Sequence, residues 1–156
     1  MDRRVKGVEL FKQGYNCAQS VVFAFADVLP IDEQTLLKIS NPFGGGFART
    51  RNLCGTVSGA GMVLGLLHRD IDDVDENKKA VYREVRELTD KFKALNGTLN
   101  CGELLKNIKN ITDGYVPDAR TEEYYRVRPC TKFVYEMIGI LEEFIREKDL
   151  ADLDHE

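Results

Sequence analysis

Apolar residues recur along most of the chain at the spacing of an α-helix. Val5, Val8 and Phe11 lie three positions apart near the start of the chain. Two longer stripes follow farther along, at Val74, Val81, Val85, Leu88, Phe92 and Leu95 and at Val134, Ile138, Leu141 and Ile145. Spacings of three, four and seven place apolar side chains on one helix face. No segment shows the strict alternation of a half-buried strand, so the pattern predicts an all-α protein.

Helix-breaking and capping residues divide this pattern into separate elements. The predicted helices are one that ends at Gly14, residues 17 to about 29, a short one capped by Asp32, residues 53–67 capped by Asn52, residues 74–95 ended by Gly97, a short one capped by Asn100, and one that starts at Pro129. Residues 41–46 and 110–120 are predicted loops. We therefore expect a single-domain compact bundle of about six to seven helices over residues 1–150. The acidic tail, residues 151–156, is predicted to fray.

The predicted helix 53–67 is unusually rich in small residues. They are Gly55, Ser58, Gly59, Ala60, Gly61 and Gly65. Each glycine inside a helix costs about 1 kcal/mol relative to alanine. Such a helix is favoured where another backbone must approach closely, so we expect it at the centre of the bundle.

Composition and charge exclude several functional classes. The 156 residues are 43% hydrophobic and 31% charged, with a net charge of −4, and the basic residues are scattered. This balance does not favour a nucleic-acid partner. The longest apolar run, residues 21–26, is too short to span a membrane, and the polar start is unlike a signal peptide. We expect a cytoplasmic protein that is not inserted in a membrane; a homo-oligomer stays open.

The four cysteines carry the candidate chemistry. Structural disulfides are rare in a reducing cytoplasm, so cysteines there favour a metal, redox or catalytic role. Cys17, Cys54, Cys101 and Cys130 each fall in the first turn of a different predicted helix. The free N–H groups and dipole of a helix start stabilise a thiolate. Their separations of 37, 47 and 29 positions include no C-x₂-C pair, so a shared site must be assembled by the fold.

Three functions fit these cysteines. The first is an electron-transfer or metal site in which all four bind zinc or an iron–sulfur cluster. The second is a thiol–disulfide protein with an unknown redox partner. Cys54 would be its reactive thiol, because it lies at a helix start, has glycine neighbours and follows two arginines, Arg49 and Arg51, and one of the other three cysteines would resolve the disulfide. The third is a helical interaction module whose cysteines are buried core residues. No set of residues indicates a particular reaction.

Residues near Cys54 are secondary candidates for binding a cofactor. The backbone of Gly44, Gly45 and Gly46 could cradle an anion, or these glycines form only a flexible turn. Arg51 could neutralise an anionic cluster, or it is a solvated loop charge. Gly55 leaves access to the neighbouring thiol.

One segment and the order of the cysteines resemble a known family. The segment Cys54-Gly55-Thr56-Val57-Ser58-Gly59 is similar to the Cys-Gly-Ala-x-x-Gly motif of the C_GCAxxG_C_C family. The other three cysteines match the remaining cysteines of that family in order, and the resemblance covers most of the chain. Thr56 departs from it, because the motif has alanine there. The resemblance implies redox activity. A similar domain is associated with split-Soret cytochromes, where an iron–sulfur site has been inferred, and this analogy favours a cluster.

Overall fold

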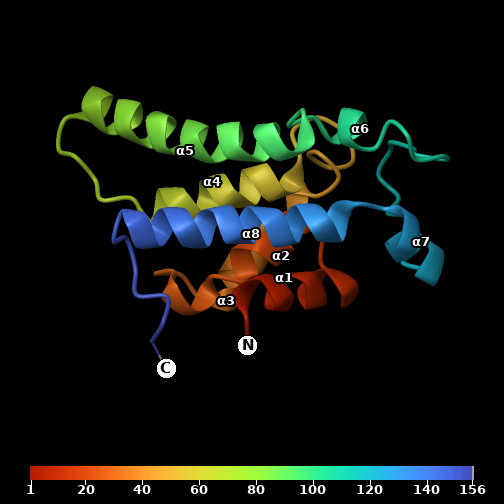
Figure 1. Ribbon diagram of the computed structural model, residues 1–156, viewed down its shortest axis with the longest axis horizontal. Helices are drawn as coiled ribbons and strands as arrows, with labels where there is room; N and C mark the ends of the chain where they lie inside the picture. Colours follow the sequence, from red (N-terminus) through yellow and green to blue (C-terminus); the bar gives the residue numbers. More distant parts are fainter. Residues whose placement is uncertain (156) are drawn as a thin grey trace.

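Eight α-helices and two single turns of 3-10 helix make up residues 1–155, the part of the chain that this computed structural model describes (Figure 1). In chain order they are α1 (Arg3–Lys12), α2 (Cys17–Phe23), η1 (Ala26–Val28), α3 (Glu33–Ser40), η2 (Asn41–Phe43), α4 (Gly55–Leu67), α5 (Val74–Asn96), α6 (Cys101–Leu104), α7 (Glu122–Val127) and α8 (Cys130–Glu147). Residues 1–155 contain no strand, and one isolated bridge joins Leu53 to Asn100. The predicted all-α class is confirmed.

Side-chain caps explain where most helices begin. Asn16, Asp32 and Asn100 each accept a hydrogen bond from a backbone N–H in the first turn of the helix that follows, as the sequence predicted. Asn16 also forms a reciprocal capping box with Gln19. At the other end of α5, Gly97 adopts a left-handed conformation and terminates the helix.

Several predicted boundaries were wrong. Helix α4 begins at Gly55, and its N-cap is Cys54 rather than Asn52. Helix α2 ends at Phe23, and η1 covers much of the remaining predicted helix. The six-residue helix α7 was not predicted, because a segment this short shows too little periodicity.

Helix α4 lies at the centre of the bundle. In Figure 1 it runs between α5 and α8, and α2 also packs directly against it. The predicted close approach of another backbone occurs at two of its glycines, Gly55 and Gly59. A Cβ atom at Gly59 would lie 2.9 Å from the carbonyl oxygen of Ala18 in α2. Gly61 and Gly65 face open space, so their absence of a side chain is not required by packing.

The C-terminal helix supplies much of the core. Eight of its side chains are buried: Phe133, Val134, Met137, Ile138, Ile140, Leu141, Phe144 and Ile145. The acidic tail, which we expected to fray, contacts the domain at Leu153. That side chain is only 8% exposed, and its carbonyl oxygen accepts a hydrogen bond from Arg3.

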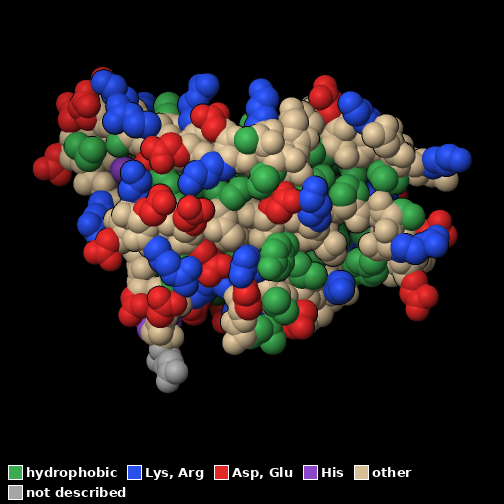
Figure 2. Space-filling view, viewed as in Figure 1, with side chains coloured by type: hydrophobic (Ala, Val, Ile, Leu, Met, Phe, Trp, Pro, Cys, Tyr) green, Lys and Arg blue, Asp and Glu red, His purple; other side chains and the backbone are tan. Residues whose placement is uncertain are grey.

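The visible surface carries both signs of charge. Figure 2 shows acidic and basic side chains interspersed over the face formed by α5 and α8. Within residues 1–155, no helix is both long enough and apolar enough to cross a membrane.

Candidate redox site

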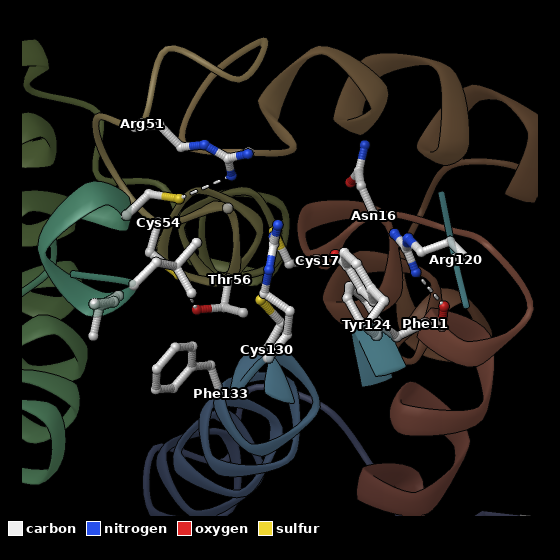
Figure 3. Close-up of a pocket in the computed structure, with 16 residues that line it drawn as sticks. Phe11, Asn16, Cys17, Arg51, Cys54, Thr56, Arg120, Tyr124, Cys130 and Phe133 are labelled. Carbon is white, nitrogen blue, oxygen red and sulfur yellow. Dashed lines mark hydrogen bonds between the residues drawn. The ribbon is translucent and has the colours of Figure 1, made fainter. Parts of the chain in front are cut away.

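The fold brings the four cysteines to one cavity. Cys17, Cys101 and Cys130 are the first residues of α2, α6 and α8, and Cys54 immediately precedes α4. All four line a cavity of about 60 Å³ at this end of the bundle (Figure 3). Cys54 and Cys101 are buried, whereas Cys17 and Cys130 are half-buried, with surface toward the cavity. The structure thus brings together four residues that are far apart in sequence.

Backbone hydrogen bonds hold two of these cysteines beside each other. The N–H of Cys54 donates to the carbonyl of Leu99 at 2.8 Å, and the N–H of Cys101 donates to the carbonyl of Asn52 at 2.6 Å. These bonds tie the segment before α4 to the segment before α6. They explain why Asn52 does not cap a helix, because its carbonyl already accepts a hydrogen bond from the N–H of Cys101.

Polar groups contact two of the sulfur atoms. The hydroxyl of Thr56 lies 3.1 Å from the sulfur of Cys54, and Nη1 of Arg51 donates to the sulfur of Cys101 at 3.7 Å. Thr56 therefore supplies a hydroxyl group at the sulfur of Cys54.

Burial dominates the acidity of three thiols. It raises the pKa of Cys17, of Cys54 and of Cys130, the last to about 12, and the neighbouring cysteines add to each increase. The backbone N–H groups of Gly45 and Ala18, which lie near the sulfur of Cys17, lower its pKa only in part. The lowered thiol pKa expected from helix starts is therefore not found at these three residues, because loss of solvent outweighs the helix dipole.

The glycine-rich segment before Cys54 packs against the site. Gly45 supplies the N–H group at Cys17, and a Cβ atom at Gly46 would lie 2.6 Å from Cβ of Cys101. A Cβ atom at Gly44 would lie 2.6 Å from side-chain atoms of Asn16. A Cβ atom at Gly55 would overlap the sulfur of Cys17. These four glycines let the backbone approach the cysteine side of the cavity.

Comparison with known proteins assigns the chain to a family. The family model described as "Putative redox-active protein (C_GCAxxG_C_C)" matches residues 15–144, most of the chain and all four cysteines. This chain belongs to the C_GCAxxG_C_C family. It is also 29% identical to an "Uncharacterized protein" of Archaeoglobus fulgidus, over 66% of this chain and 74% of that protein. No solved structure matches the chain.

In this C_GCAxxG_C_C protein, sequence reasoning missed a group of charged residues beside the cysteines. Arg120 and Arg128 line the cysteine cavity together with Arg51. Asp118 accepts hydrogen bonds from Arg49, Arg51 and Arg128. Arg120 and Arg128 come from the predicted loop and the unpredicted α7 region, so no periodic signal linked them to Cys54. The sequence indicates Arg49 and Arg51 as candidates, but only the fold shows that both donate to Asp118.

The cysteines do not form a preformed site for a single metal ion. Within residues 1–155, no group of three or more histidine, cysteine, aspartate or glutamate side chains is placed to hold one metal ion. The four thiols line one cavity, but no three of them are placed to hold one metal ion.

Proposed function

We propose that this protein is an electron-transfer protein in which Cys17, Cys54, Cys101 and Cys130 together hold one iron–sulfur cluster. The supporting observation is that four cysteines from four separate helix starts line a single cavity. Four cysteine thiolates are the usual ligand set of such clusters. The family's description as redox-active supports the same class of function.

The size of the cavity favours a small inorganic group. A water molecule needs at least about 10–15 Å³ of cavity volume. The cysteine cavity, at about 60 Å³, is several times larger, yet it is far smaller than the pockets that hold organic cofactors.

The lack of a preformed site for a single metal ion favours a cluster over zinc. One zinc ion with four Zn–S bonds of about 2.3 Å draws its sulfur atoms to within about 4 Å of each other. No such group is preformed in residues 1–155. A cluster with several irons distributes its thiolates over a wider volume, which suits residues that line a cavity.

The surrounding groups suit an anionic cluster. When bound, the cluster would supply one-electron chemistry. The guanidinium groups of Arg51 and Arg128 would offset its negative charge. Hydrogen bonds to cysteine sulfurs, such as those of Thr56 with Cys54 and of Arg51 with Cys101, are of the kind that tune a cluster's potential.

The test is anaerobic purification, or reconstitution with iron and sulfide, followed by absorption spectroscopy and iron and sulfide analysis. We expect visible absorption between roughly 320 and 600 nm. Cys17→Ser and Cys130→Ser should lose the absorption. Thr56→Ala keeps all four ligands and is the matched control: it should retain the absorption and show a lower reduction potential. A folded protein that stays colourless and iron-free after reconstitution would refute the cluster.

A thiol–disulfide function is the second candidate, because the four free cysteines share one cavity. Burial and the raised thiol pKa of Cys54 count against that residue as the attacking thiolate. This function would be supported by a colourless protein that gains one disulfide reversibly, seen as a mass loss of about two hydrogens. The third hypothesis, an interaction module, has support only in that Cys54 packs in the hydrophobic core.

A further inference from the structure

A second, outer cavity adjoins the cysteine cavity. Its volume is about 360 Å³, within the size range of small-molecule pockets. The two cavities share six lining residues: Asn16, Gly45, Arg51, Arg120, Tyr124 and Arg128. A molecule bound in the outer cavity would therefore lie beside the cysteine cavity.

The lining of the outer cavity is strongly positive. It contains four arginines, at positions 49, 51, 120 and 128, and only one acidic residue, Asp118. These charges leave an excess of three positive charges in a chain whose net charge is −4. The charge of the cavity lining is thus opposite in sign to the net charge of the protein.

One carboxylate accepts hydrogen bonds from three of these arginines. Oδ2 of Asp118 accepts from Arg128 at 3.0 Å, from Arg49 at 3.2 Å and from Arg51 at 3.4 Å. Burial alone would raise the pKa of Asp118, but Arg128 and Arg49 hold it below its ordinary value, so this group is ionised at neutral pH. The three arginine side chains are only 8–13% exposed. Holding so many positive charges away from water against one negative charge is unfavourable unless an anion joins them.

Arg120 has no carboxylate partner among these residues. Its two Nη atoms donate to the backbone carbonyls of Phe11 and Tyr15, and its guanidinium lies 4.2 Å from the ring centre of Phe11. These neutral contacts orient the guanidinium but leave its charge uncompensated.

Donors remain available for a ligand. Arg128 donates to Asp118 through Nη2 alone, although a guanidinium has five N–H groups. Arg51 uses each of its three nitrogens once, so two N–H groups stay unused. Arg49, in contrast, donates to Thr112, Asp113, Gly114 and Asp118 and therefore acts as a positioning residue.

We propose that the outer cavity binds a small molecule through a phosphate or carboxylate group, held by Arg51, Arg120 and Arg128. Planar guanidinium groups with several N–H donors match the geometry of such oxyanions. This proposal depends on the arginines alone and not on the occupant of the cysteine cavity.

Calorimetric titration of the reduced protein with inorganic phosphate, and separately with malonate, tests the proposal. Ionic strength is held constant with sodium chloride, because arginine surfaces also attract anions without a defined site. We expect one saturable site for at least one probe, and the tighter probe identifies phosphate or carboxylate as the preferred group. Arg128→Gln and Arg51→Gln should each weaken binding about tenfold, the effect of losing one charge-assisted hydrogen bond.

Two further variants distinguish a defined anion site from general attraction of anions to positive charge. Arg126→Gln removes the same charge from a side chain in α7 that is 75% exposed, and it should leave affinity unchanged within about twofold. Asp118→Asn removes the competing carboxylate and should tighten binding. Absence of saturable binding for both probes, or equal weakening by Arg126→Gln and Arg128→Gln, would overturn the proposal. The titrations are run with and without reconstitution, so a colourless protein that still binds phosphate refutes only the cluster.

Discussion

Consecutive residues of the glycine-rich loop have positive φ angles. Five consecutive residues, Gly45 to Arg49, have φ values of 63°, 70°, 78°, 48° and 62°, and Arg51 follows at 61°. Left-handed conformation costs a residue with a side chain about 1–2 kcal/mol and normally occurs singly. Here the run is held by backbone bonds such as Ala48 N–H to Pro42 and Asn52 N–H to Gly46. The same run places Arg49 and Arg51 at the outer cavity, so the strain lies at the candidate site.

Replacing one residue of this run by glycine should relieve strain. Ala48 is exposed and has φ of 48°, so we expect Ala48→Gly to increase the free energy of unfolding by about 0.5–1 kcal/mol. The matched control is Ala80→Gly inside α5, which should lower it by about 1 kcal/mol. Urea unfolding measures both. Equal destabilisation by the two substitutions would contradict a strained loop.

The hydrogen-bond partners of His68 lead to a prediction about its pKa. Nε2 faces Oδ1 of Asn77 at 2.9 Å, and Nδ1 faces Oε2 of Glu84 at 3.0 Å. Both neighbours are acceptors, since the Asn77 oxygen also accepts from the N–H of Ile71. Although burial lowers the pKa of His68, the contacts with Asn77 and Glu84 outweigh it, so that the pKa is raised. When His68 is protonated, both imidazole nitrogens can donate to these acceptors.

The sign of the resulting pH dependence follows from the raised pKa. Stabilisation by charged His68 is complete below the unfolded-state pKa of about 6.5 and is lost as pH rises through the higher folded-state pKa. We expect wild type to exceed His68→Gln in stability most at pH 6, with the difference shrinking toward pH 8. Thermal unfolding of both proteins across this range measures it. A difference that grows with pH would show that His68 is neutral in the fold.

At the scale of single elements, α4 joins packing to the site. Its face toward α2 has glycine where the two backbones meet, and its other glycines face open space. Close approach at Gly55 and Gly59 brings the start of α2, with Cys17, against the start of α4, with Cys54. Helix packing and cysteine convergence are therefore consequences of the same small residues.

Two alanine substitutions in α4 should have opposite effects. Gly59→Ala places a methyl group 2.9 Å from the Ala18 carbonyl, and we expect a loss of about 1–3 kcal/mol in the free energy of unfolding. Gly61→Ala meets nothing within 4 Å and should gain up to about 1 kcal/mol from helix propensity. Guanidinium unfolding compares them. Stabilisation by both would mean that α2 and α4 are not held closely at Gly59.

The elements also show what sequence patterns can and cannot predict. Long amphipathic helices such as α5 and α8, and capped starts such as Asn16 and Asn100, were predictable because their signals are local. The start of α4 was misplaced, because tertiary hydrogen bonds to α6 keep residues 52–54 out of the helix. The convergence of the cysteines could be anticipated from their shared position at helix starts. The arginines around Asp118 could not, because their common partner exists only in three dimensions.

At the scale of the whole molecule, one cavity couples four helices from across the chain. The starts of α2, α4, α6 and α8 must all be in place before the four thiols share it. Any ligand that binds all four therefore binds the folded state alone and stabilises the entire domain. Without a ligand, burial raises the pKa of three of these thiols, and that affects how the metal-free protein responds to alkali.

The reduced, metal-free protein should lose stability above about pH 9. Burial raises the folded-state pKa of Cys17, Cys54 and Cys130 above the ordinary value of 9.0. Their stabilisation is complete below that unfolded-state value and decreases as pH rises toward the folded-state values, because only the unfolded chain releases the protons. Three such thiols give a slope of at most about 4 kcal/mol per pH unit, at about 1.36 kcal/mol for each proton. Urea unfolding between pH 7 and 10 measures it, and a variant with all four cysteines replaced by alanine isolates the thiols from lysine and tyrosine titration. Parallel losses in the two proteins would show that the thiols ionise equally well when folded, whereas a steeper loss in wild type alone would locate the alkaline sensitivity in the cysteine cavity.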